Sequence, residues 1–485
     1  MKQKILLQYY KLLAFFAKKY LQKHNPIIIG INGSVGKTSC RAIIHQTLQH
    51  YFPDQKIYTS SKNFNGELGL PLSVFCKESR TPNIWEFIRT LFNFAYQSLF
   101  AKKKYDVIIL EYGIDRPGEM DFLLNIAKPD IGVFTALDAV HSEQFGDPNA
   151  IAEEEVKMPL NTKEVVFLNN DEPYTHQIIN SIKIDKLTYQ TTGAKPNANI
   201  TFQNSHIINN TENNNIANSF ELTIGKKNHS ITTNQIGKIN HGYIGVALAI
   251  TEILAHKFQK NNPLQKEITL NYTLLPGRMT LFAGVEESII LDSTYNASPL
   301  SMRRLIDTTH QIKQSFLFNK DNEQNKNKKN KQVRLALGDM RELGDFTEKE
   351  HRLLAGYCQG IADKMFLVGE SMKNYFLDEA EKIGCDMKTI QHFKNSKLLG
   401  NAMKTALEKL SLKSKEYNQE NKSPLKRGNP ANARRGIGNS EEVIILCKGS
   451  QNTIFLEEAV KILLKNKADS KHLVRQSEFW LSKKK

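Results

Sequence analysis

Apolar runs of strand length alternate with helical patterns along most of this chain. In the first half the runs lie at 26–31, 106–110, 131–135 and 164–168, and turn or helix residues follow each of them. Parallel strands need a long crossover connection, usually a helix, whereas antiparallel strands can be joined by a tight turn. The alternation therefore predicts an α/β fold in which helices flank a parallel sheet.

The pattern changes between residues 197 and 236, where polar and apolar residues alternate among many Asn and Thr. A period of two is typical of antiparallel strands with one buried face. We expect a small antiparallel insertion here, followed by a helix near 242–258 and a domain boundary near Pro276.

Beyond Pro276 the alternation of strands and helices resumes. Strand-length runs lie at 288–291, 333–337, 364–368 and 442–446, separated by helical stretches. This repetition predicts a second, Rossmann-like α/β domain.

Two segments of the second half, near 318–332 and 411–440, are rich in Asn and Lys and hold almost no apolar residues. Segments of this composition cannot bury a core, so we expect exposed loops there. The expected organisation is an amphipathic helix at 1–24, a central domain at 25–273 and a C-terminal domain at 274–485.

A glycine-rich loop follows the first apolar run. Residues 33–38 read Gly-Ser-Val-Gly-Lys-Thr and precede a helical pattern. In this position backbone N–H groups and the positive end of a helix can hold phosphates, with Lys37 at the β- and γ-phosphates and Thr38 at Mg²⁺. Ile31 stands where the general phosphate-loop pattern has glycine. The segment predicts a central P-loop ATPase domain that binds ATP through Gly33, Ser34, Val35, Gly36, Lys37, Thr38 and Ser39.

This loop and seven further segments resemble the Mur ligase family, and they occur in the family's order. The segments lie at 30–38, 62–71, 111–119, 135–143, 276–279, 292–299, 338–344 and 448–450. The resemblance implies an ATP-dependent ligase that activates a carboxylate as an acyl-phosphate and joins it to an amine. The member that the chain most resembles adds D-alanyl-D-alanine to a UDP-N-acetylmuramoyl-peptide in peptidoglycan precursor synthesis.

Two other functions stay open at this point. One is another ligase of the same fold, of the folylpolyglutamate or cyanophycin type, although the Tyr-Asn-Ala segment at 295–297 and the segment at 338–344 argue against it. The other is a catalytically silent nucleotide-binding protein at the membrane.

The resemblance implies catalytic roles for Lys37, Glu111, His141 and Glu155, and metal ligation by Thr38, Glu111 and His141. Because negative charge is crowded at the γ-phosphate, a lysine and Mg²⁺ ions suit the chemistry. Mg²⁺ prefers oxygen ligands, which Thr38 and Glu111 offer, whereas only the resemblance supports His141. Taken alone, Glu111 could equally be a solvated carboxylate, and His141 could be structural.

The resemblance also implies that the C-terminal domain closes on the nucleotide. Arg278 is then expected at a phosphate, Asp292 at the ribose hydroxyls, and Asn240 of the central domain near the adenine. Residues 276–278 could instead be only an interdomain hinge. In addition, the substrates are expected to contact Asn63, Asn65, Tyr295 and Asn296.

The chain departs from the family pattern at Glu155, which aligns with a lysine that the family carries in carbamylated form. A carbamylated lysine is anionic, so a fixed carboxylate could replace it, although with a shorter reach. Lys157 is the rival, but on a helix it points roughly 200° away from Glu155. Glu155 could also be a solvated acid. Ala136 replaces an asparagine of the family, and the phosphate loop begins near the N-terminus, where full-length relatives have a separate UDP-binding domain.

The net charge of +16 does not favour nucleic-acid binding, because most of it lies near the chain ends and in the two polar segments. Five dispersed cysteines suggest neither a disulfide framework nor a zinc site, which fits the cytoplasm. In the helix at 1–24 the apolar run, which Lys11 interrupts, is too short to span a bilayer. The helix either packs on the domain or lies on the inner face of an anionic membrane. Expected partners are a UDP-linked or other peptide acceptor and an amino acid or dipeptide.

Overall fold

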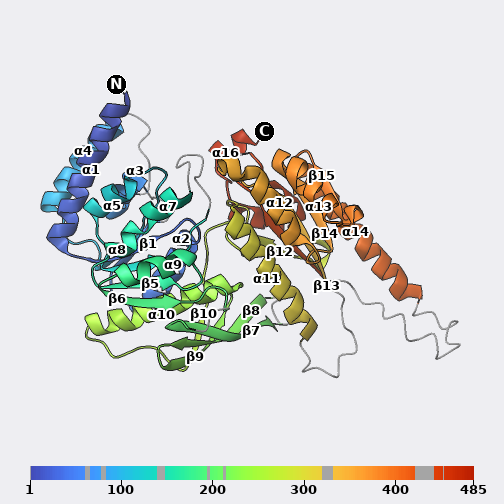
Figure 1. Ribbon diagram of the computed structural model, residues 1–485, viewed down its shortest axis with the longest axis horizontal. Coiled ribbons are helices and arrows are strands. Elements are labelled where there is room, and N and C mark those ends of the chain that lie inside the picture. The colour runs from blue at the N-terminus through green and yellow to red at the C-terminus, as the bar shows by residue number, and fades with distance from the viewer. Residues whose placement is uncertain are drawn as a thin grey trace. The chain divides into compact units, whose positions relative to one another are not determined.

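The computed structural model describes residues 2–60, 66–77, 84–138, 148–193, 197–210, 215–318, 331–420, 442–451 and 453–484. The chain divides into two compact units, Met1–Thr273 and Leu274–Lys485 (Figure 1). In each unit helices accompany a largely parallel sheet, which confirms the α/β fold class.

The first unit is built on a 10-stranded sheet of order β10-β9-β8-β7-β6-β5-β4-β1-β3-β2. Strand β1 (Ile27–Asn32) lies in its parallel part, between β3 (Val107–Glu111) and β4 (Ile131–Phe134). Every residue of β3 and β4 is buried, as expected where helices cover both faces of a parallel sheet. The other strands are β2 (Ile57–Thr59), β5 (Val165–Asn169), β6 (Asp185–Tyr189), β7 (Ile200–Asn210), β8 (Asn215–Ile224), β9 (Lys227–Thr233) and β10 (Glu267–Leu270).

The strands β7, β8 and β9 pair antiparallel, as the alternation of polar and apolar residues with a period of two predicts. They extend the same sheet, and β7 and β8 pack against helix α10 (Lys238–Lys257). The remaining α-helices of this unit are α1 (Lys2–His24), α2 (Lys37–Tyr51), α3 (Gly66–Val74), α4 (Ile84–Phe100), α5 (Glu119–Ile126), α7 (Pro148–Glu155), α8 (Lys157–Leu160) and α9 (Pro173–Ile178).

Helix α1 has one side in the core of the first unit. Leu13, Ala17 and Tyr20 have no exposed surface and belong to one apolar cluster with residues of α3, α4 and α5. The packing of this helix on the domain, one of the two interpretations of its sequence, is therefore confirmed. In the described part of the chain, no helix has both the length and the apolar character needed to cross a bilayer.

The second unit is built on a 6-stranded sheet of order β11-β12-β16-β13-β14-β15. Only the edge strand β11 runs antiparallel to its neighbour. The strands are β11 (Thr280–Ala283), β12 (Ile289–Asp292), β13 (Lys331–Gly338), β14 (Lys364–Val368), β15 (Ile390–Phe393) and β16 (Glu442–Lys448). The α-helices are α11 (Pro299–Phe318), α12 (Thr347–Cys358), α13 (Leu377–Lys382), α14 (Ser396–Glu420), α15 (Glu457–Leu463) and α16 (Glu478–Lys483).

The polar segment expected as a loop from residue 411 begins instead as helix, because α14 continues to Glu420 (Figure 1). Its residues there are mostly Lys, Glu, Gln and Leu, which favour a helix even without a buried face. In the other polar segment, α11 ends at Phe318 and β13 begins at Lys331. Residues 319–330 and 421–441 lie outside the described residues.

The five cysteines are all free thiols. Cys40 in α2, Cys358 in α12 and Cys447 in β16 have no exposed surface. Burial raises the pKa of each of these three thiols. Cys76 and Cys385 are partly exposed.

Candidate active site

The phosphate loop connects β1 to the N-terminus of α2 in the first unit. Gly33 (φ +117°) and Gly36 (φ +95°) lie in a backbone region that L-residues with side chains rarely adopt. A Cβ atom at Gly33 would collide with the Thr135 hydroxyl, and one at Gly36 with the Tyr243 hydroxyl. Both glycines are therefore required by local geometry.

The segment after β4 supports this loop from one side. The backbone N–H groups of Ser34 and Val35 donate to the carbonyl oxygen of Ala136 at 2.7 and 3.3 Å. The Lys37 ammonium donates to the carbonyl of Gly33, so the side chain folds back over the loop. Ala136 supports the loop through its backbone carbonyl oxygen.

Glu111, the last residue of β3, lies beside the first turn of α2. The Thr38 hydroxyl donates to Glu111 Oε2 at 3.3 Å, and Arg41 Nε lies 2.8 Å from Glu111 Oε1. The side chains of Arg41 and Glu111 are almost fully buried. Two oxygens at this spacing suit neighbouring ligands of one Mg²⁺, which binds oxygen at about 2.1 Å. Thr38 and Glu111 therefore fit the expected metal.

Arg41 is a residue of this site that the sequence interpretation missed. It also donates to the hydroxyl and the carbonyl oxygen of Ser60, at 2.8 and 2.5 Å. Its position four residues after Lys37 places it on nearly the same side of the helix, which could have indicated it. Arg41 holds the Glu111 carboxylate in a fixed orientation.

Glu155, the last residue of α7, reaches the phosphate loop. Its Oε2 accepts from Gly33 N–H at 3.1 Å and from Asn32 Nδ2 at 3.0 Å, and Asn32 Nδ2 also donates to its backbone carbonyl at 2.5 Å. With 2% of its surface exposed, Glu155 is not a solvated acid. Its carboxyl group is held in place at the start of the loop.

Lys157 occupies a different place. Its Nζ donates to Asp121 at 2.6 Å and to Glu154 at 2.8 Å. These two hydrogen bonds, that to Asp121 first, raise the pKa of Lys157. A carbamylated lysine must first react as the neutral amine, which this environment disfavours.

The other expected residues of the first unit are placed as follows. Asn240 is buried in the first turn of α10, donates to the carbonyl of Ile236 at 3.0 Å, and belongs to a helix that packs against α2. Asn63, Asn65 and His141 lie outside the described residues. Within the described residues, no group of three or more His, Cys, Asp or Glu is arranged to hold a metal ion.

In the second unit, Asp292 ends β12 next to the loop that carries Tyr295 and Asn296. Its Oδ1 accepts from Thr294 N–H at 3.0 Å and from the Thr294 hydroxyl at 2.6 Å. Oδ2 is buried without a hydrogen-bond partner among the described residues. Burial, partly offset by the Thr294 hydrogen bonds, raises the pKa of Asp292 to about 6. Because the carboxylate has no exposed surface, contact with a ribose would require this loop to move.

Two other parts of the second unit also contact the loop after Asp292. The Arg278 guanidinium lies over the Tyr295 ring, 4.3 Å from its centre, and Tyr295 N–H donates to the carbonyl of Gly277 at 3.1 Å. Lys448 Nζ donates to the carbonyl of Asn296 at 2.9 Å and to the Ser293 hydroxyl at 3.2 Å. Arg278, Tyr295 and Asn296 are thus close together in one unit.

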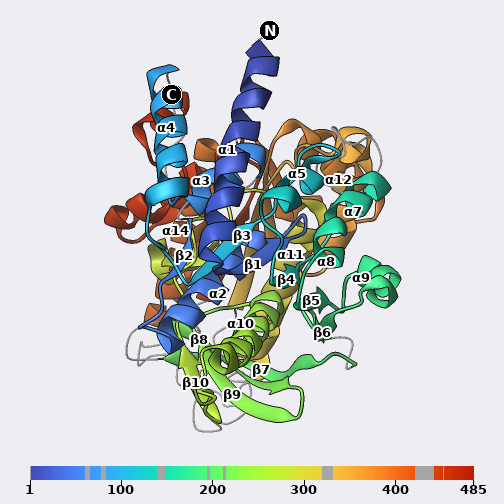
Figure 2. The same cartoon turned by 90° about the vertical axis from the view of Figure 1, so that its left-hand side faces the viewer.

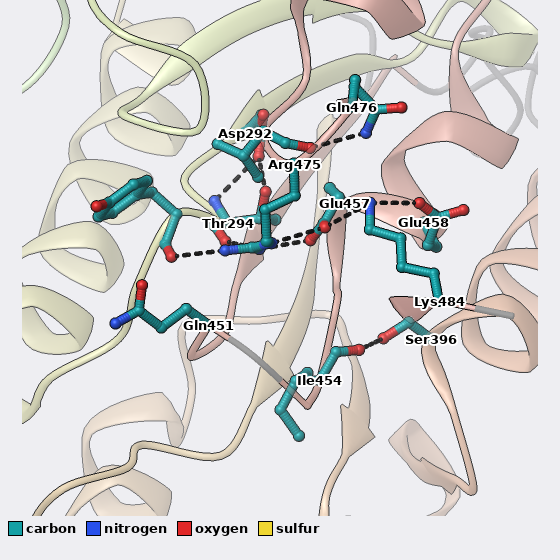
Figure 3. A network of polar contacts seen from close by, with 12 residues as sticks. Asp292, Thr294, Ser396, Gln451, Ile454, Glu457, Glu458, Arg475, Gln476 and Lys484 are labelled. Carbon is teal, nitrogen blue, oxygen red and sulfur yellow. Dashed lines mark hydrogen bonds and ion pairs between the residues drawn. The ribbon is translucent and has the colours of Figure 1, made fainter. Parts of the chain in front are cut away.

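Arg475 is a second residue that the sequence interpretation missed. Its guanidinium donates to the carbonyls of Thr294 and Tyr295 at 2.7 and 3.0 Å, and to both carboxylate oxygens of Glu457 at 2.5 and 2.8 Å (Figure 3). Lys484 also pairs with Glu457 at 2.7 Å. Glu457 is fully buried, so this ion network holds the loop from within the unit. No sequence pattern could have predicted these contacts, because Arg475 is distant in sequence from the loop that it binds.

Comparisons with known proteins find similar sequences and similar folds. Residues 31–251 match the family model described as the Mur ligase middle domain. A UDP-N-acetylmuramoyl-tripeptide–D-alanyl-D-alanine ligase of Bacillus subtilis is 26% identical over 392 residues, which are 80% of this chain and 72% of the relative.

Solved structures share the fold. MurF from Acinetobacter baumannii superposes with a TM-score of 0.64 at 16% identity, over 95% of this chain and 80% of that one. MurF from Thermotoga maritima in complex with ADP superposes with a TM-score of 0.63 at 17% identity, over 96% of this chain and 85% of that one.

Proposed function

We propose that this chain is a ligase of the Mur ligase family, whose middle-domain model its residues 31–251 match, and that it joins a peptide carboxylate to an amine at the expense of ATP. The acceptor is a UDP-N-acetylmuramoyl-peptide and the amine is D-alanyl-D-alanine, as in the name of the B. subtilis relative. The product is a peptidoglycan precursor. The observation that carries the proposal is the grouping of Lys37, Thr38, Glu111 and Glu155 around one phosphate loop.

The reaction has two steps. A carboxylate oxygen of the acceptor attacks the γ-phosphorus of ATP, and the bond to the β,γ-bridging oxygen breaks to release ADP. The amine nitrogen then attacks the carbonyl carbon of the acyl-phosphate, inorganic phosphate leaves, and the nitrogen loses a proton.

The residues of the first unit have separate tasks in this scheme. Backbone N–H groups at the N-terminus of α2 and the Lys37 ammonium hold the phosphates and offset their charge. Thr38 and Glu111 would hold Mg²⁺, which supplies Lewis acidity at the phosphates when bound. Arg41 orients Glu111. Arg278 and Asp292 of the second unit are proposed to contact a phosphate and the ribose, and Asn240 the adenine.

We further propose that Glu155 takes the place of the family's carbamylated lysine. Its burial and its hydrogen bonds to Gly33 and Asn32 support a fixed negative charge at the loop. The pairing of Lys157 with Asp121 and Glu154 speaks against the rival residue. A permanent carboxylate needs no carbon dioxide, so ligation should not depend on bicarbonate.

The function is tested by incubating the purified chain with ATP, Mg²⁺ and a panel of UDP-linked and free peptides, with D-alanyl-D-alanine or single amino acids. We expect ADP and phosphate release only when both an acceptor and an amine are present. Mass spectrometry should find an acceptor heavier by the dipeptide. Product with a single amino acid would indicate another ligase of the fold, and nucleotide binding without any product would indicate a catalytically silent protein.

We place this reaction in the cytoplasm. Five free thiols fit a reducing compartment, and nucleotide substrates are available there. The proposal includes no nucleic-acid partner.

A further inference from the structure

Helix α4 exposes an apolar stripe to solvent. Trp85, Phe92 and Tyr96 have 77%, 71% and 63% of their surface exposed, although they are among the largest side chains of the unit. Ile88, Leu99 and Phe100 continue the same stripe. The opposite side of the helix is already used for the fold, since Thr90, Phe94 and Ser98 are buried. The stripe is therefore additional to what packing requires.

Helix α1 lies alongside α4 in both views of the molecule (Figures 1 and 2). Tyr9 of α1 and Phe87 of α4 have ring centres 4.5 Å apart, and the Tyr9 hydroxyl donates to the Phe87 carbonyl at 3.3 Å. At the other end, the Lys23 ammonium donates to the carbonyl of Leu99. The two helices therefore run parallel, and α1 has exposed apolar residues of its own, Leu12 and Phe15.

Basic side chains accompany the apolar ones. Lys11 and Lys19 of α1, Arg89 of α4 and Lys102 after α4 are exposed, and the Lys19 ammonium lies over the Phe15 ring at 4.7 Å from its centre. We call these basic residues and the eight apolar residues Leu12, Phe15, Trp85, Ile88, Phe92, Tyr96, Leu99 and Phe100 the α1–α4 face. The only acid of α1 and α4 is Glu86.

We propose that the α1–α4 face docks on the surface of an anionic lipid bilayer. Aromatic side chains prefer the boundary between headgroups and acyl chains, where Trp and Tyr keep their polar atoms hydrated. Lysine and arginine beside them are attracted to anionic headgroups. The combination of a broad apolar stripe and flanking positive charge fits such a surface. This inference does not depend on the ligase activity.

Point variants test the face better than truncation. Removing residues 1–24 would also remove Leu13, Ala17 and Tyr20 from the core, so lost binding could then reflect unfolding. The joint replacement Trp85→Ser, Phe92→Ser and Tyr96→Ser changes only exposed side chains. Phe479→Ser, at an exposed phenylalanine of α16, is the matched control.

The first experiment measures co-sedimentation of the full chain with vesicles. We expect binding to phosphatidylglycerol–phosphatidylcholine vesicles, at least about tenfold weaker binding by the triple variant, and unchanged binding by Phe479→Ser. Added salt should weaken binding, because screening acts over about 10 Å at 0.1 M. Equal binding to vesicles of phosphatidylcholine alone, or equal binding by the triple variant, would overturn the proposal.

The second experiment uses the two tryptophans, Trp85 and Trp480. In a Trp480→Phe variant, Trp85 alone reports on the α1–α4 face. Its emission should shift to shorter wavelength with anionic vesicles and stay constant as the protein alone is concentrated. A shift that follows protein concentration without vesicles, together with dimers in sedimentation velocity that the triple variant abolishes, would show a self-association surface instead. Ligase assays without vesicles should be the same for all these variants.

Discussion

Glu155 gives the sharpest prediction at the scale of single residues. In Glu155→Gln the amide oxygen can still accept the hydrogen bonds of Gly33 and Asn32, so the loop should keep its shape while the negative charge is lost. We expect turnover to fall by about 10²-fold, because a neutral amide could not offset the positive charge of a second Mg²⁺ as the family's anionic lysine would. Steady-state ligation with and without bicarbonate measures this, and the wild type should be insensitive to bicarbonate.

The matched control is Glu153→Gln, an exposed acid on the same helix, which should retain full activity. Glu155→Lys should regain part of the activity when bicarbonate is added, since a carbamylated lysine would restore the charge. The assignment would be wrong if Glu155→Gln were fully active, or if a bicarbonate requirement disappeared in Lys157→Ala.

Lys37 permits a simpler test. Lys37→Ala removes the ammonium that lies over the phosphate loop, and we expect turnover to fall about 10²-fold or more with the fold intact. Circular dichroism should match the wild type, and Lys56→Ala, an exposed lysine of the same unit, should have normal activity. Near-normal turnover of Lys37→Ala would contradict the proposed role of the phosphate loop in the reaction.

Asp292 predicts a dependence of stability on pH. Its pKa is raised from 3.8 to about 6, so the folded chain binds this proton more tightly than the unfolded chain does. The free energy of unfolding should therefore decrease as pH rises from about 4 to about 6, by up to about 3 kcal/mol, and this contribution should be constant above that range. Denaturant titrations of the wild type and of Asp292→Asn should differ in this slope. Parallel pH profiles would show that Asp292 is ionised with its ordinary pKa.

At the scale of elements, the Arg475 network connects the C-terminal segment to the loop after β12. Arg475→Met would remove one of the two cations that contact the fully buried Glu457. We expect a loss of about 3 kcal/mol in unfolding free energy, and a smaller loss when Glu457→Met is added, because an uncompensated buried charge costs more than a lost pair. Arg352→Met, which breaks a more exposed ion pair with Asp378, is the control and should have little effect.

The buried strands and the phosphate loop could be predicted because few amino acids fit their positions. A strand covered on both faces must be apolar, and Gly33 and Gly36 must be glycine where a Cβ atom would collide with Thr135 and Tyr243. The α14 extension was missed because its polar composition was taken to indicate a loop, although Lys, Glu, Gln and Leu also favour a helix. Arg41 and Arg475 were missed because their roles depend on partners that are distant in sequence. The exposure of the apolar stripe of α4 could not be predicted. A periodic apolar pattern is the same whether that side of the helix faces solvent or is covered by another element.

At the scale of the whole molecule, two separate units divide the expected nucleotide contacts. Lys37, Thr38 and Asn240 belong to the first unit, and Arg278 and Asp292 to the second. If both sets bind one ATP, as we propose, Arg278→Ala should raise the KM for ATP several-fold with little change in the stability of the first unit. Kinetics at varied ATP, together with thermal unfolding, measures both quantities. An unchanged KM would leave residues 276–278 as a hinge only.

Each unit contains a buried cysteine whose reactivity can report on that unit separately. Cys40 lies in the helix that begins at Lys37, whereas Cys447 pairs in register with Asp292 across β12 and β16. Both thiols are inaccessible and have a raised pKa, so an alkylating reagent should modify them only when the surrounding structure opens. The labelling rate of Cys40 therefore reports on opening of the first unit, and that of Cys447 on opening of the second. ATP should lower the labelling rate in each unit that it contacts.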